Sequence, residues 1–327
     1  MSRLLSGRAF DSLVVDELLG NGGMAEIYAA RHGSTAVVVK RVHPHLARDP
    51  DFVAMFEDEI RITARLRHRG IVAVLDVLRP PDEVLLVLER VDGVDLRTEL
   101  TRAHDVAAPL DIAAVLSCMH HVAEALAYVH SATDDHEVGL GIVHRDISPG
   151  NLMARAGGGA CILDFGVARA AARVAKTTGS ITKGKPSYLS PEQASMDAVG
   201  PLSDVYQLGL VLFELLTGQR ALVGRSPLDL MRAAVRPIAV PPSTLRADVV
   251  PELDELVRAM RAIDPRERPT AERVAAALLG FRDHPGMRSA ADLGAEQQRR
   301  EAVARRDRAL ELAAGLDDDD TQPIRTR

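Results

Sequence analysis

The chain has 327 residues, of which 46% are apolar and 26% are charged, and it carries a formal net charge of −6. This composition is typical of a globular protein, and the length allows two lobes with a short appendage. An acidic protein lacks an overall basic field, which argues against nucleic acid as a partner captured by charge. The two cysteines, Cys118 and Cys161, have neither disulfide-scaffold nor zinc-ligand spacing, so we expect buried free thiols.

No targeting segment is evident in the sequence. The opening ten residues, MSRLLSGRAF, are too few and too polar for the apolar part of a signal peptide. No run approaches the roughly 18 apolar residues that a membrane-spanning helix needs. We therefore expect a cytoplasmic protein without a membrane segment.

The N-terminal part alternates short apolar runs with turn residues, a pattern that predicts a sheet. Two turns, Gly20-Asn21-Gly22-Gly23 and Arg31-His32-Gly33, separate the first three runs. A helix is expected over about 51–67, where apolar residues recur at helical spacing. Strand character then returns, which gives five strands and one helix. The predicted strands are 13–19, 25–30, 36–42, 71–78 and 83–89.

After Asp92-Gly93 the spacing of apolar residues becomes helical, and a larger, mainly helical lobe is expected. The stretch 131–141 is polar and contains glycine, so we predict a solvated loop there. The predicted helices of this lobe are 115–129, 202–217, 227–235, 251–263 and 271–279.

The last forty residues have a different composition. Residues 288–316 are rich in Ala, Arg, Glu and Leu and contain no proline, which predicts a tail helix. Four aspartates follow at Asp317–Asp320 and indicate a disordered acidic terminus. The predicted organisation is an N-terminal tail at 1–9, a main domain at 10–281 with lobes at 10–90 and 91–281, a tail helix within 282–316, and an acidic terminus at 317–327.

One short segment contains the residue types that phosphoryl transfer needs. His144-Arg145-Asp146 is followed by Asn151, and Asp164-Phe165-Gly166 begins thirteen residues after Asn151. A carboxylate that accepts a proton and two oxygen ligands for a metal ion thereby lie within one stretch of sequence. The pattern predicts transfer of a phosphoryl group to a hydroxyl.

Features of the N-terminal part fit this chemistry. The glycines at 20–23 would let backbone N–H groups approach phosphate oxygens, although a simple hairpin turn is the alternative. Because a strand is predicted to follow this turn, and not a helix, a Rossmann-type site is not indicated. Lys40 ends an apolar strand, where a lysine often only reaches water. Glu59 lies in the predicted helix, and an ion pair with it would hold the Lys40 ammonium against the phosphates.

These motifs together resemble those of bacterial Hanks-type (eukaryotic-like) serine/threonine protein kinases over about residues 10–281. The resemblance implies an α+β, bilobal fold with a small five-stranded N-lobe, one main helix in that lobe, and a larger, mainly helical C-lobe. It also implies ATP and Mg²⁺, with Mn²⁺ as an alternative metal, and protein substrates with Ser/Thr acceptors. The matching segments occur in the family's order and are GNGGMAEIY, VVVK, HRDISPGN, DFGVAR, SYLSPEQ, DVYQLG and DPRERP.

The resemblance assigns catalytic and metal-binding roles to single residues. Asp146 would deprotonate the acceptor hydroxyl, while Asn151 and Asp164 would hold the metal ion. Lys40 would contact the α- and β-phosphates of ATP. Its partner would be Glu59, in preference to the acidic residues at the two preceding positions.

The resemblance also implies a nucleotide pocket. Leu88 would be the gatekeeper beside the adenine, and the backbone of Glu89 and Val91 would hydrogen-bond that base. For the apolar members of the pocket, core packing is the alternative explanation, and the two roles are compatible. The other implied contacts are Leu19, Gly20, Asn21, Gly22, Gly23, Ile27, Val38, Lys40 and Met153.

Three further residues are implied to have structural roles. Asp204 would be a buried carboxylate that accepts hydrogen bonds from the backbone of the catalytic loop. Glu192 would form an ion pair with Arg268.

Two positions depart from the family pattern. Ser148 stands where these kinases usually have a lysine that contacts the γ-phosphate, and Lys185 stands where they usually have a threonine. We hypothesise that Lys185 supplies the positive charge that Ser148 lacks. The alternatives are a slower enzyme and a nucleotide-binding pseudokinase or scaffold that acts through protein interactions. Pro149 after Ser148 favours Ser/Thr acceptors over tyrosine.

Several hydroxyl groups are candidates for phosphorylation. Arg145 would pair with a phosphorylated residue in the segment after Asp164-Phe165-Gly166, although these hydroxyls would otherwise only solvate a loop. Thr321, beside the four aspartates, is a candidate site for a phosphothreonine-binding partner. The candidates in the segment after Gly166 are Thr177 and Thr178, followed by Ser180 and Thr182.

A P-loop is a second candidate phosphate-binding motif in the sequence, and it would indicate a different class of enzyme. Residues 179–185 fit the first seven positions of a Walker A loop, but Pro186 stands where a Ser or Thr is needed. Proline has neither the hydroxyl for Mg²⁺ nor the backbone N–H for the phosphate, so this site is rejected.

Overall fold

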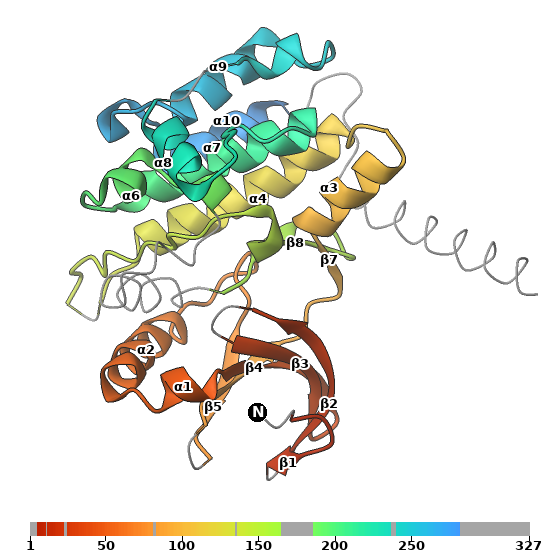
Figure 1. Ribbon diagram of the computed structural model, residues 1–327, viewed down its shortest axis with the longest axis vertical. Helices are drawn as coiled ribbons and strands as arrows, with labels where there is room; N and C mark the ends of the chain where they lie inside the picture. Colours follow the sequence, from red (N-terminus) through yellow and green to blue (C-terminus); the bar gives the residue numbers. More distant parts are fainter. Residues whose placement is uncertain are drawn as a thin grey trace, which may run out of the picture.

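The computed structural model describes residues 5–10, 12–22, 25–80, 83–134, 136–164, 186–236 and 240–281, except for the side chains at 51, 55, 58, 59, 61 and 62. These residues form two lobes, a small one built on a sheet and a larger helical one (Figure 1). The predicted tail helix and acidic terminus lie outside the described residues.

The small lobe is built on a six-stranded antiparallel sheet with the strand order β1-β2-β3-β4-β6-β5. Two helices follow β4, the four-residue α1 (Pro44–Ala47) and α2 (Pro50–Thr63). The prediction of five strands omitted β1, an edge strand of two residues that is too short to produce a periodic signal. The strands are β1 (Ala9–Phe10), β2 (Leu13–Asn21), β3 (Ala25–His32), β4 (Thr35–Val42), β5 (Val74–Leu78) and β6 (Leu85–Glu89).

Each face of this sheet buries its own apolar cluster, because alternate residues of a strand point to opposite faces. One cluster includes Leu5, Leu13 and Tyr28, which are fully buried. The residue Leu5, predicted within an N-terminal tail, therefore packs into the lobe, and Gly7 N donates to Val15 O over 2.8 Å. The opposite face is covered by α2 through Phe52, Phe56 and Ile60.

The large lobe is mainly helical and contains a small sheet with the order β7-β8-β9. The five predicted helices are confirmed, with ends within three residues of those expected. Helix α3, the five-residue α6 and the small sheet were not predicted. The strands are β7 (Gly93–Asp95), β8 (Leu152–Arg155) and β9 (Ala160–Ile162), and the helices are α3 (Leu96–Asp105), α4 (Ile112–His130), α6 (Pro191–Ser195), α7 (Pro201–Thr217), α8 (Pro227–Val235), α9 (Pro251–Met260) and α10 (Ala271–Gly280).

Helices α4 and α7 form the centre of the large lobe. In α7, every residue from Ser203 to Leu216 is buried. Within the part of the chain that the structure describes, α4 is the one helix long and apolar enough to cross a bilayer. Its apolar residues, among them Met119 and Leu126, are fully buried in the core of the lobe, which accounts for that composition.

Candidate active site

A buried carboxylate on α7 accepts hydrogen bonds from the backbone of the catalytic loop. Asp204 is fully buried, and its two oxygens accept hydrogen bonds from His144 N over 2.9 Å and Arg145 N over 2.7 Å. His130 Nε2 donates to the same carboxylate over 2.9 Å. The structural role predicted for Asp204 is thereby confirmed, and the loop backbone is fixed by three donors that converge on one side chain.

A second anchor, Gln207, was not predicted. Its Oε1 accepts from Ile147 N over 3.0 Å, and its Nε2 donates to Arg145 O over 3.1 Å. Gln207 lies three residues after Asp204 on α7, so both side chains project from one face of the helix. That spacing was the available signal in the sequence.

Asp146 is held by Asn151. The Asn151 amide nitrogen donates to the Asp146 carbonyl oxygen over 2.7 Å and to Asp146 Oδ2 over 2.8 Å. A short 3₁₀ turn at Pro149–Asn151 supports this contact, and Asn151 N donates to Ser148 O over 2.9 Å within it. The carboxylate of Asp146 therefore has a defined orientation.

His144 connects the catalytic loop to the strand that leads to Asp164. Its Nε2 donates to Leu163 O over 3.0 Å, while its Nδ1 accepts from Asp146 N over 3.2 Å. Leu163 N donates in turn to Asn151 O over 2.8 Å. These bonds hold the residue before Asp164 against the loop that carries Asp146 and Asn151.

Two residues of this segment have left-handed backbone conformations. Arg145 has φ = 69° and Asp164 has φ = 58°. Such values cost a residue other than glycine of order 1 kcal/mol, and they persist where the surroundings fix the backbone. The hydrogen bonds from Arg145 to Asp204 and around Leu163 supply that restraint.

Lys40 extends from the small lobe to the same place. It lies on β4, opposite Ile27 of β3, and it is 5% exposed. Its Nζ lies 2.7 Å from Asp164 Oδ1. This ion pair joins the two lobes and offsets the cost of burying the ammonium. The side chain of Glu59, the predicted partner, lies outside the described residues, although its backbone belongs to α2.

The predicted glycine loop forms the end of the β2–β3 hairpin. Gly20 and Asn21 end β2, and Gly22 N donates to Ala25 O over 2.9 Å. His43, which the sequence did not single out, donates from Nε2 to Gly22 O over 2.8 Å and fixes the base of the turn. Gly23 lies outside the described residues.

Of the apolar residues predicted to contact the nucleotide, Ile27 pairs with Gly20 of this loop. Val38 pairs with Leu88 across β4 and β6, so both lie on the face of the sheet that carries Lys40. Four of the five predicted apolar contacts are half-buried and Leu19 is exposed, as expected for the wall of a cleft and not for a closed core. The half-buried residues are Ile27, Val38, Leu88 and Met153.

The connection between the lobes begins at Glu89, at the end of β6. Its backbone N–H already donates to Ala73 O over 2.9 Å, so only its carbonyl oxygen would serve the adenine. Its carboxylate accepts from Ala73 N over 3.3 Å and from Arg155 Nη1 over 2.8 Å. Val91, the other predicted backbone contact, is half-buried.

The predicted pair of Glu192 and Arg268 is confirmed. Arg268 Nη1 and Nη2 lie 2.6 and 3.0 Å from the two carboxylate oxygens, and Ser203 Oγ donates over 3.0 Å. Burial opposes ionisation of Glu192, but the hydrogen bonds from Arg268 and Ser203 hold its pKa below its usual value. The pair ties α6 to the segment between α9 and α10.

Of the two positions that depart from the family pattern, the structure describes only one. Ser148 lies within the catalytic loop and is fully buried. Lys185 lies outside the described residues, as do the candidate phosphorylation sites. Those sites are Thr177, Thr178, Ser180, Thr182 and Thr321.

Comparison with known proteins identifies the family. Residues 13–278 match the protein kinase domain family, and the chain belongs to it. This confirms the predicted α+β bilobal kinase fold. The kinase domain of Mycobacterium tuberculosis PknI superposes with a TM-score of 0.65 at 26% sequence identity, covering 85% of this chain and 99% of that one.

Curated relatives include bacterial kinases with different named acceptors. The chain is 36% identical over 284 residues to the tyrosine-protein kinase MasK of Myxococcus xanthus, covering 85% of this chain and 44% of MasK. It is 39% identical over 290 residues to the serine/threonine-protein kinase PknB of Mycolicibacterium smegmatis, covering 84% of this chain and 43% of PknB. The chain thus spans less than half the length of these relatives.

Proposed function

We propose that this protein is an ATP-dependent kinase that transfers the γ-phosphate to Ser/Thr hydroxyls of protein substrates in bacterial signalling. One observation carries the proposal. Asn151 donates to Asp146 over 2.8 Å, Lys40 lies 2.7 Å from Asp164, and a backbone hydrogen bond from Leu163 to Asn151 joins the two segments that carry these pairs. Family membership supports ATP and a divalent metal as cofactors.

The residues present fit a Mg²⁺ ion bound together with ATP. Magnesium is usually held by one or two protein oxygen ligands plus substrate phosphates, and Mn²⁺ accepts the same ligands. Asp164 offers a carboxylate, and Asn151 offers its side-chain oxygen because its nitrogen is committed to Asp146. When bound, the ion would offset negative charge on the transferring phosphoryl group.

Asp146 is proposed as the base that accepts the proton of the acceptor hydroxyl. The hydrogen bond from Asn151 to Oδ2 fixes the orientation of the carboxylate that would meet the acceptor hydroxyl. The transfer needs little covalent chemistry from the protein, so alignment of this carboxylate is its main contribution.

Lys40 is proposed to exchange partners when ATP binds. Its ammonium lies against Asp164 at 2.7 Å and would move to the α- and β-phosphates, which leaves the carboxylate for the metal ion. Glu59 on α2 is the proposed partner of Lys40 in that state. The glycine loop at 20–23 would cover the phosphates with backbone N–H groups.

The proposed acceptors are serine and threonine, in line with Pro149 in the catalytic loop and with PknB among the relatives. The name of MasK makes tyrosine the competing possibility. Three of the four tyrosines of this chain, Tyr28, Tyr188 and Tyr206, are buried, which disfavours tyrosine as a site of autophosphorylation.

The proposal is tested with ³²P-labelled ATP and Mg²⁺ or Mn²⁺ on the wild-type chain and on Asp146→Asn, followed by phosphoamino-acid analysis. We expect label on serine or threonine in the wild type alone. Absence of label in both proteins would favour the pseudokinase or scaffold, and equal label in both would contradict the role of Asp146. Label confined to tyrosine would overturn the proposed acceptor.

We further propose that Lys185 compensates for Ser148. A point charge near the γ-phosphate can be supplied from either segment, because an ammonium acts without a fixed direction. The expected result is that Lys185→Ala slows phosphoryl transfer and that the double variant Ser148→Lys, Lys185→Thr restores it. Unchanged turnover in Lys185→Ala contradicts the exchange. Since Ser148 is fully buried, the melting temperature of each variant is the control for folding.

Autophosphorylation on Thr177 or Thr178, with Arg145 as the partner of the phosphate, is the proposed activating step. Fragment mass spectrometry of the wild type beside Asp146→Asn tests it, and absence of phosphate on that segment counts against it. A cytoplasmic location and a phosphothreonine-binding partner at Thr321 complete the proposal.

A further inference from the structure

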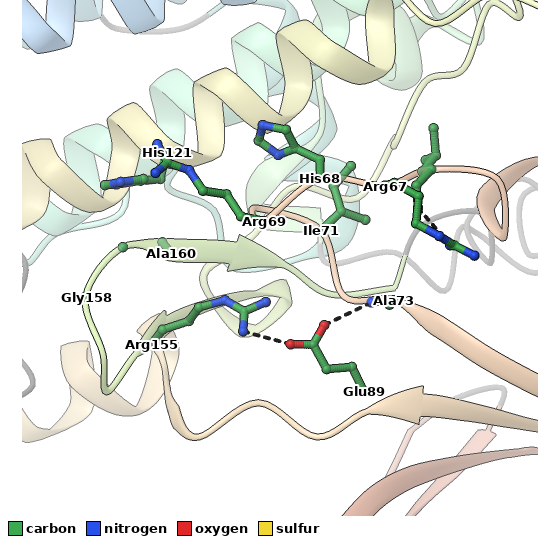
Figure 2. A pocket seen from close by; sticks show the side chains of 12 residues that line it. Arg67, His68, Arg69, Ile71, Ala73, Glu89, His121, Arg155, Gly158 and Ala160 are labelled. Atoms are coloured by element: carbon green, nitrogen blue, oxygen red, sulfur yellow. Dashed lines mark hydrogen bonds and ion pairs between the residues drawn. The ribbon is translucent and has the colours of Figure 1, made fainter.

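A cavity of about 490 Å³ lies behind the connection between the lobes (Figure 2). Glu89 lines it, and its side chain points to the opposite face of β6 from Leu88, because alternate strand residues face opposite sides. The cavity is therefore separate from the candidate nucleotide wall. Its volume is within the range of ligand sites, which is roughly 300–1,000 Å³.

Arginine side chains dominate the lining of this cavity. Arg67 and Arg69 precede β5, and Arg155 ends β8. Two carboxylates lie close to them: Glu89 accepts from Arg155 over 2.8 Å, and Glu124 of α4 accepts from Arg69 over 3.0 Å. Arg67 has no carboxylate partner among the described residues and donates from Nη1 to Ala64 O over 2.8 Å and to Leu66 O over 3.2 Å, so the lining carries one positive charge more than its two carboxylates balance.

These guanidinium groups have donors to offer a ligand. Each guanidinium carries five N–H donors, and the carboxylate contacts use one nitrogen of Arg69 and one of Arg155. Arg155 also contacts the buried Cys161 side chain, so its part in binding a ligand would fall to the nitrogens at the end of the guanidinium. Arg69 is 70% exposed, so an anion reaches it from solvent.

The two histidines that line the cavity are neutral, so they form part of its wall but add no charge. Burial lowers the pKa of both His68 and His121, so both rings are neutral at pH 7. His121 lies against the turn at Gly159, where a Cβ would stand 3.4 Å from its ring. The glycine turn therefore keeps the cavity open beside His121.

The chain itself contains an anion suited to this cavity. Asp317–Asp320 is the longest run of acidic residues in the sequence. The described part of the large lobe ends with α10 and Phe281, and α10 packs along α4, where His120 Nδ1 donates to Ala275 O over 2.9 Å. The next residue of α4 is His121, which lines the cavity. Ala275 thus contacts the residue of α4 next to this lining residue, and Phe281 follows Ala275 by six residues, about 9 Å along a helix.

The length of the intervening segment permits contact within one chain. Residues 282–316 would span about 50 Å as a helix, or more if extended. A tether of this length gives an effective concentration on the order of millimolar, which favours intramolecular contact between groups that bind weakly when separate.

We propose that the acidic segment Asp317–Asp320 docks in the cavity formed by Arg67, Arg69 and Arg155. A second carboxylate at Arg155 would share the guanidinium that binds Glu89 through Nη1 and would weaken that contact. Docking would therefore change the restraint on the end of β6, a consequence that rests on the proposed nucleotide site. The docking itself requires no catalysis.

A spin label tests the contact in the full chain. An Asp318→Cys substitution provides the labelling site, because burial raises the pKa of Cys161 to about 11 and of Cys118 to about 12, and both native thiols are buried. We expect the nitroxide to broaden the backbone amide signals of Arg69, His121 and Gly159. Absence of this broadening overturns the proposal.

Charge-reversal variants decide whether the contact is the one proposed. Arg67→Glu with Arg69→Glu should abolish the broadening, and changing the remaining aspartates 317, 319 and 320 to lysine should restore it. The matched control, Arg225→Glu with Arg258→Glu, reverses two exposed charges on α9 and the loop before α8 and should have no effect. Broadening that is unchanged in the charge-reversal variants overturns the proposal.

A mixed sample separates contact within a chain from contact between copies. Isotope-labelled protein without the nitroxide is combined with unlabelled protein that carries it, and no broadening is expected. Broadening in that sample would assign the acidic segment to a second copy and overturn the intrachain contact. Because the measurement needs no ATP, an inactive protein that still docks its tail separates this inference from the proposed function.

Discussion

The two sides of the candidate active site are held in different ways. Asp204 and Gln207, both buried on α7, bind the backbone of the catalytic loop. The end of β6 is held instead by Glu89 and Arg155, whose side chains are 34% and 26% exposed. Loss of a buried acceptor leaves backbone donors unsatisfied, whereas loss of a partly exposed ion pair costs little. The catalytic side is therefore rigid, and the β6 side is adjustable.

The largest stability effect is expected at the buried anchor. Asp204→Ala leaves two backbone N–H groups and His130 without their acceptor, and we expect it to lower the free energy of unfolding by about 3–5 kcal/mol. Denaturant unfolding measures the loss. Asp16→Ala, which removes an exposed ion pair with Arg31, is the control and should cost less than about 1 kcal/mol. Equal effects of the two changes would remove the distinction between the two sides.

A smaller and pH-dependent effect is expected at Glu192. Its folded-state pKa lies below the ordinary value of 4.5, so its pairing with Arg268 stabilises the fold above that pH. The stabilisation is lost as the pH falls through the folded-state pKa. Glu192→Gln should cost roughly 1.5–3 kcal/mol near neutral pH, and the difference from wild type should shrink in acid. A difference that does not vary with pH contradicts this account, and exposed Glu252→Gln is the control.

The smallest effect is expected on the adjustable side. Arg155→Gln removes the ion pair with Glu89, and we expect a change in unfolding free energy below about 1 kcal/mol because both side chains contact solvent. Thermal unfolding and nucleotide titration of the same variant measure it. A loss as large as that of Asp204→Ala would show that the β6 side is rigid as well.

The sequence predicted the segments that have a strong apolar period or a recognisable motif, and it missed short or polar segments. Long apolar helices such as α4 and α7 have a strong period, and motif residues such as Asp204, Glu192 and Arg268 have contacts that the family resemblance implies. Helix α3 was missed because its sequence, LRTELTRAHD, is largely polar and only Leu96 and Leu100 are buried. The strands of the small sheet have three or four residues, too few for a periodic signal.

The unpredicted parts of the site depend on contacts between distant segments. The ion pair of Lys40 with Asp164 needs the two lobes to be placed together, which no local pattern encodes. The same holds for His43, which binds the glycine turn across a strand, and for Arg155 at the cavity behind β6. Local sequence thus identifies chemical groups, while their pairing follows from the packing of the lobes.

The most direct test of the account is the single-turnover rate of phosphoryl transfer by Asp146→Asn beside the wild type. Asp146 is half-buried, and asparagine has the same shape and an amide oxygen that can still accept from Asn151, so the variant should fold normally. We expect transfer to serine or threonine to fall by roughly 10²–10⁴-fold, the usual contribution of a positioned base. An unchanged rate in a folded Asp146→Asn protein would contradict the proposed role of this carboxylate.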